Sequence, residues 1–98
     1  MLIRSTVIPV LFAALALTGP ALAAPTAAQK DEFYAVCMGI SGDAALCSCK
    51  ADAAMELIDE RFMGVVIASM QGGSPAASDY TAYNAYIAAS NRICMPGY

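Results

Sequence analysis

Apolar and polar residues follow a helical period along most of the chain after residue 26. In the first such segment, one face at about 100° per residue carries Phe33, Val36 and Cys37. Thr26 with Gln29 three positions later is a capping-box pattern, which marks a helix start. Gly39 offers a C-terminal stop. The pattern predicts a helix over about residues 27–38.

A second segment follows the turn at residues 41–43, where Asp43 is suited to cap a helix. One broad apolar arc of this helix carries Leu46, Cys47, Ala51, Ala54, Met55, Leu57 and Ile58. Cys47 falls near the middle of the arc. Because residues two positions apart diverge by about 200° on a helix, Cys49 falls close to the polar edge.

The third segment, residues 59–73, allows two interpretations. Its run of Val65, Val66 and Ile67 has high strand propensity. However, its apolar residues also form one helical stripe, Asp59 can cap the start, and no second strand-like run exists to pair with it. We therefore expect a helix here.

The fourth segment, residues 80–95, follows a linker at 74–79. One face carries Tyr80, Tyr83, Ile87, Ser90 and Cys94, with Tyr86 and Ile93 beside it. Such a tyrosine stripe could line a ligand groove, but it is more often core packing. Together the four segments predict a small all-α bundle of about four short helices stapled by two disulfides.

The first residues predict export. Arg4 precedes an apolar run, which ends at Gly19 and Pro20 and is followed by the small-residue site Ala-Leu-Ala at 21–23. This is the layout of a cleaved secretory signal peptide, and the run is too short for a membrane anchor. We expect residues 1–23 to be the signal peptide and 24–98 to be one domain, without a transmembrane segment, in the periplasm or outside the cell.

The charges of the predicted mature chain disfavour nucleic acid as a partner. Residues 24–98 carry eight acids and four bases, a net charge of −4, and no basic patch. The chain has no histidine, which removes the commonest general base and the commonest metal ligand. We expect no catalytic residues, cofactor or metal.

Four cysteines lie in the predicted mature chain, at Cys37, Cys47, Cys49 and Cys94. An even count in a short exported chain is typical of a disulfide framework. A bridge between Cys47 and Cys49 would be strained, because their side chains diverge on one helix. Of the two remaining pairings, Cys37–Cys47 with Cys49–Cys94 is favoured, because an antiparallel turn near Ser41 brings Cys37 and Cys47 to the same level.

Two other interpretations of the cysteines remain. Cys47 and Cys49 could form a thiol–disulfide redox site, since they sit at a helix start beside Lys50. Cysteine and methionine together could bind Cu(I). We favour the structural interpretation, because acidic residues oppose a thiolate and the methionines fall on apolar stripes.

The resulting expectation for function is broad. The chain is expected to be a small exported, non-catalytic binding or accessory protein of the cell envelope, with a protein partner. Two alternatives are a carrier of a small apolar ligand or lipid, and a redox protein that uses Cys47 and Cys49.

Overall fold

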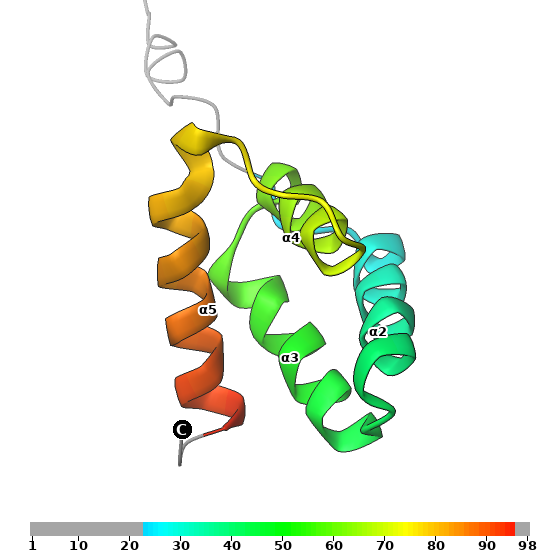
Figure 1. The fold of residues 1–98 in the computed structure, drawn as a ribbon. Coiled ribbons are helices and arrows are strands. Elements are labelled where there is room, and N and C mark those ends of the chain that lie inside the picture. Colours follow the sequence, from blue (N-terminus) through cyan, green and yellow to red (C-terminus); the bar gives the residue numbers. More distant parts are fainter. Residues whose placement is uncertain (1–22, 96–98) are drawn as a thin grey trace, which may run out of the picture.

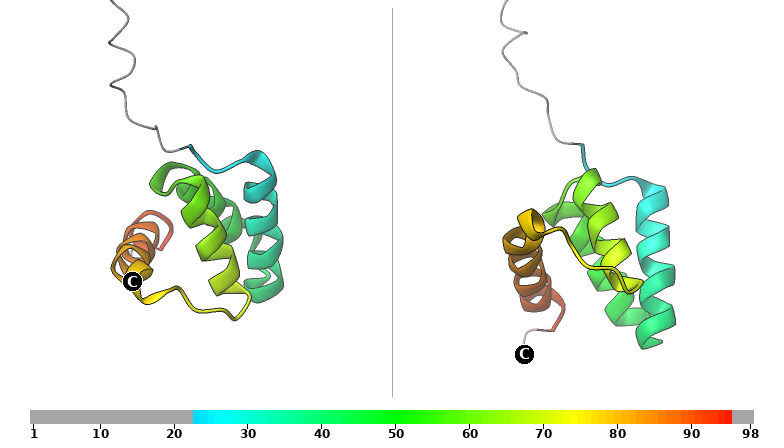
Figure 2. Two further views of the ribbon diagram at one scale, coloured as in Figure 1. Left: turned by 90° about the horizontal axis from the view of Figure 1, so that it is seen from above. Right: turned by 45° about the horizontal axis from the view of Figure 1, so that its top comes forward.

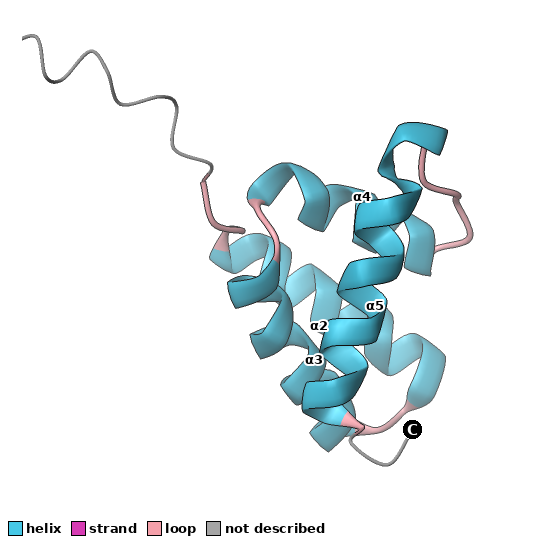
Figure 3. Ribbon diagram, turned by 90° about the vertical axis from the view of Figure 1, so that its left-hand side faces the viewer, coloured by secondary structure: helices cyan, strands magenta, loops and turns pink. Residues whose placement is uncertain are grey.

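The computed structural model describes residues 23–95, so the predicted signal peptide lies outside the described residues except for Ala23. The described chain forms helices α2 (Ala27–Ser41), α3 (Ala44–Leu57), α4 (Glu60–Met70) and α5 (Tyr80–Cys94), with a 3-10 helix, η1 (Ala77–Asp79), directly before α5. These helices are joined by short loops (Figure 3), and residues 23–95 contain no strand. The prediction of an all-α fold is confirmed, and the valine-rich third segment is helical.

Polar side chains start three of the helices, as the sequence predicts. Thr26 and Gln29 form the reciprocal capping box of α2, with both hydrogen bonds at 3.0 Å. Asp43 and Asp59 each accept the backbone N–H three residues later, at 3.0 and 2.7 Å. Caps of this kind satisfy donors that the first turn leaves unpaired, and each stabilises its helix by about 1 kcal/mol.

The predicted end of the first helix at Gly39 is wrong. Helix α2 continues to Ser41, and Gly42 ends it in the left-handed conformation with φ 67°. The backbone N–H of Gly42 donates to the carbonyl of Met38 at 3.0 Å. Glycine adopts a positive φ without the clash that a side chain would cause, so the reversal into α3 forms there.

The helices are arranged around α3. Helices α2 and α3 run antiparallel, α4 packs across α2, and α5 runs along the other side of α3 (Figure 1). Both views in Figure 2 show α5 standing apart from α2 and α4. No helix within residues 23–95 combines the length and the apolar character that crossing a bilayer requires.

The core lies where α2, α3 and α4 meet, with one contribution from α5. It consists of Phe33, Cys37, Cys47, Ala51, Ala54, Phe62, Met63, Val66, Ile67 and Tyr86. The alanines of α3 allow neighbouring helices to approach closely, and Met63 fills the centre with no exposed surface. Leu57, Tyr80 and Ile93, which the sequence places on or beside apolar faces, are 39%, 45% and 55% exposed and lie outside this core.

Two disulfides tie the neighbouring helices to α3. Cys37 bonds to Cys47, joining α2 to α3, and Cys49 bonds to Cys94, joining α3 to α5. The bridged Cα atoms lie 5.6 and 5.8 Å apart, inside the usual range for disulfides. This pairing is the one that the sequence favours.

Candidate binding groove

The space between α5 and the rest of the bundle forms an apolar groove of about 210 Å³. All four helices contribute to it. Its apolar lining comes from Phe33, Cys37, Ile40, Leu46, Val66, Met70, Tyr83, Tyr86 and Ile87. Because α5 packs mainly on α3, its inner face is free to form one wall of this groove.

The groove has a buried base and an open rim. Phe33, Val66 and Tyr86 are at most 5% exposed, while Ile40 is 64% exposed. Burial raises the pKa of Tyr86 to about 12, so its phenol is neutral at physiological pH. The buried base formed by these residues is therefore uncharged, whereas Ile40 offers an apolar contact at the edge.

Besides its apolar residues the groove is lined by Ser41, Ser90 and one cation, Lys50 of α3. Its Nζ donates to the hydroxyl of Ser90 at 2.9 Å and to the side-chain oxygen of Asn91, both on α5. Desolvation lowers the pKa of this half-buried ammonium group. No carboxylate within residues 23–95 pairs with Lys50, because the two ion pairs in this range use Lys30 and Arg61.

Ser90, at the polar end of the groove, has hydrogen-bond partners for both its donor and its acceptor. It is 1% exposed, accepts from Lys50 and donates to the carbonyl of Ile87 at 3.2 Å. A buried hydroxyl without partners would be costly, and here both its donor and its acceptor capacity are used.

The disulfides place the two central cysteines at different depths. Cys47 is fully buried in the core, whereas Cys49 is half-buried. Each thiol is bonded to a cysteine on a different helix, and none of the four cysteines is free. Cys47 and Cys49 are thus not joined in one redox-type bridge.

The described residues contain no cluster of three or more histidine, cysteine, aspartate or glutamate side chains that could hold a metal ion. A thiolate site for Cu(I) would require opening a disulfide, since both sulfur pairs are bonded. Met63, the most buried methionine, fills the core and does not reach the groove.

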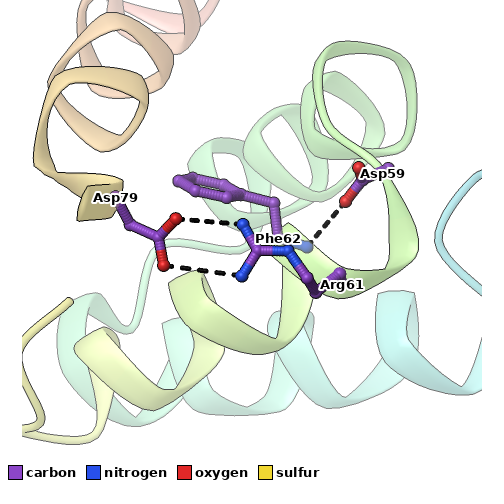
Figure 4. Close-up of polar contacts among 4 residues, drawn as sticks. All are labelled: Asp59, Arg61, Phe62 and Asp79. Carbon is purple, nitrogen blue, oxygen red and sulfur yellow. Dashed lines mark hydrogen bonds and ion pairs between the residues drawn. The ribbon is translucent and has the colours of Figure 1, made fainter. Parts of the chain in front are cut away.

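A second, wider hollow lies where α4 begins and η1 ends. Arg61 pairs with Asp79 there at 3.0 Å, and its guanidinium lies 5.6 Å from the centre of the Phe62 ring (Figure 4). Hydrogen bonding to Asp79 and the charge of its carboxylate raise the pKa of Arg61. Because Arg61 and Asp79 already pair with each other, we assign this contact a structural role, which is to hold the start of α5 near α4.

The sequence pattern identified some groove residues and missed others. The tyrosine stripe did suggest a groove or a core, and Tyr83 and Tyr86 serve both. The sequence marks Lys50 only as a neighbour of Cys49. Its partners lie 40 and 41 positions away, so no local pattern could have shown that its ammonium group reaches α5.

No protein family matches the chain, and neither a curated protein nor a solved structure matches it.

Proposed function

We propose that the chain is a small exported, non-catalytic binding protein of the bacterial periplasm, and that the groove is its binding surface. The observation that carries this proposal is the apolar groove between α5 and the rest of the bundle. The predicted signal peptide supports export, and two disulfides suit an oxidising compartment.

The size of the groove favours the carrier alternative over a groove that receives a whole protein segment. A volume of 210 Å³ corresponds to roughly seven water molecules in the liquid. A helix with its side chains is about 10–12 Å across and would not enter such a space. The proposed ligand is therefore one short alkyl chain or one ring.

The side chains of the groove support binding without chemistry. Its titratable groups are Lys50, Tyr83 and Tyr86, and the whole chain has no histidine to act as a general base. The redox alternative would need a reactive thiol, but Cys47 is completely buried and both central cysteines are bridged.

Two measurements on the chain 24–98 test this function. Native mass spectrometry of protein purified from its own envelope should show a retained small molecule. Titration with the neutral one-ring probe 4-fluorotoluene, followed by ¹⁹F NMR, should show saturable binding. Ile40→Glu should weaken probe binding about tenfold, because it removes apolar contact at the rim and adds a charge there.

Ile93→Glu is the matched control. Ile93 is also a well-exposed isoleucine, at 55%, but it does not line the groove. Its substitution should leave probe affinity unchanged. Probe binding that both variants weaken equally, or that the wild-type chain lacks, would refute the groove as the binding surface.

A further inference from the structure

The polar end of the groove differs from its walls in a way that constrains the ligand. Lys50 carries a positive charge into a lining that contains no aspartate or glutamate. Its contacts on α5 are to neutral oxygens, the hydroxyl of Ser90 and the amide oxygen of Asn91. The charge of the ammonium group is therefore hydrogen-bonded but not neutralised by any described residue.

From this arrangement we propose that the groove selects small amphipathic anions, with an alkyl chain or ring against the apolar walls and a carboxylate on the ammonium group of Lys50. The inference rests on the proposed function and deepens it, because it names the chemical class of the ligand.

The donor count at Lys50 supports this assignment. An ammonium group has three N–H donors, and Ser90 and Asn91 accept two of them. Within residues 23–95 the third donor has no partner, so it can donate to a ligand oxygen. Ser90 and Asn91 hold the nitrogen in place beforehand, so less side-chain entropy is lost when the anion binds.

Partial burial strengthens the expected contact. Desolvation lowers the pKa of Lys50, because partial burial disfavours its charged form. A bound carboxylate would favour the charged form through a charge-assisted hydrogen bond, which is stronger than one between neutral groups. The chain is otherwise acidic, so the selectivity for an anion must come from this local contact rather than from long-range attraction.

Octanoate and 1-octanol form a matched pair of probes, because they share the alkyl chain and differ in the charged end. Each is titrated against bound 4-fluorotoluene on the folded chain 24–98 at pH 7, with the probe followed by ¹⁹F NMR. Lys50→Met keeps the length of the side chain and removes the charge. We expect this substitution to lower the affinity for octanoate about tenfold and to change the affinity for octanol by no more than about twofold.

Lys30→Met is the control for net charge. Lys30 lies outside the groove and pairs with Asp52 at 2.7 Å on the exterior of α2 and α3. Its substitution removes the same charge from the protein and should leave the affinities for octanoate and octanol unchanged. Lys50→Arg should recover most of the octanoate affinity, because it restores a cation.

The outcomes separate this inference from the proposed function. If octanol displaces the probe and Lys50→Met binds octanoate as well as the wild type does, the groove stands and the anion preference is wrong. If Lys50→Met weakens both ligands equally, Lys50 acts by holding α5 in place, and the preference is again wrong. If the wild-type chain binds neither ligand nor the neutral probe, both proposals fail.

A spectroscopic signature provides a second test. Octanoate carrying ¹³C in its carboxyl group reports its own ionisation through the carbon chemical shift. A contact with Lys50 favours the carboxylate, so the pKa of bound octanoate should lie below that of free octanoate. This lowering of the octanoate pKa should vanish in Lys50→Met. An equally large lowering of the pKa in that variant would overturn the assignment.

Discussion

The two disulfides should stabilise the fold unequally, because they close loops of very different length. Cys49–Cys94 spans 45 positions and Cys37–Cys47 spans 10. The chain-entropy relation gives about 4 kcal/mol for the longer loop and about 2.7 kcal/mol for the shorter one. A domain of this size has a total free energy of unfolding of only about 4–11 kcal/mol. The bridge to α5 should therefore supply a large share of the stability.

A direct comparison of alanine variants would confuse this effect with packing. Cys47 is fully buried and Cys49 is half-buried, so their replacement leaves different cavities. The better measurement compares the oxidised and reduced forms of one variant, so that the two cysteines under test remain in the chain. C37A/C47A retains only the long bridge, and C49A/C94A retains only the short one. Each is unfolded in urea in its oxidised form and after reduction, with helicity followed by circular dichroism.

Reduction should lower the free energy of unfolding by about 4 kcal/mol in C37A/C47A and by about 2.7 kcal/mol in C49A/C94A. A reduced variant that is already unfolded without urea can be measured instead through its equilibrium with glutathione, in the folded and the urea-unfolded state. A short bridge that contributes as much as the long one would contradict the reasoning.

The remaining predictions concern two glycines and one tyrosine. Gly42→Ala should lower the free energy of unfolding by about 1 kcal/mol, because Gly42 has φ 67°, a conformation that disfavours a side chain. The added methyl group would meet no neighbour within 4 Å, so the effect comes from the backbone conformation alone. Gly39→Ala, inside α2 with equally open space, should instead stabilise by about 0.5–1 kcal/mol, and urea unfolding distinguishes the two. Tyr86 has a pKa of about 12 against an ordinary value of 10.0, so the folded state holds its proton more tightly. The resulting stability is complete below pH 10 and is lost as the pH rises to about 12, by at most about 2.7 kcal/mol. Tyr86→Phe should remove this loss of stability, whereas Tyr80→Phe, at an exposed tyrosine, should preserve it. Equal dependence of unfolding free energy on pH in the two variants would show that Tyr86 is not the titrating group.

The parts of the fold that the sequence predicts depend on short-range geometry. Asp43 and Asp59 cap helices because each carboxylate reaches an amide three residues later, a distance fixed by the helix itself. Local geometry also excludes a Cys47–Cys49 bridge, since two thiols on opposite sides of one helix cannot bond to each other, and the short turn near Ser41 favours Cys37–Cys47 among the remaining pairings.

The parts that the sequence does not predict depend on long-range packing. Gly39 and Gly42 are chemically identical candidates for ending α2, and the choice depends on where α3 must begin. Tyr80 is exposed although it shares a face with buried residues, because α5 touches its neighbours only along part of its length. The ammonium of Lys50 meets α5 only once the fold has formed.

The Cys-Ser-Cys sequence links the stability of the fold to the existence of the groove. Because Cys47 and Cys49 point to different sides of α3, one bridge holds α2 and the other holds α5. Helix α5 is also held near its start by the Arg61–Asp79 pair. These ties at its two ends supplement the apolar packing of Tyr86 in the core, so that α5 is positioned without close packing along its whole length. The apolar surface between α5 and the rest of the bundle can therefore stay open, and the disulfides offset the stability that filling it would have contributed.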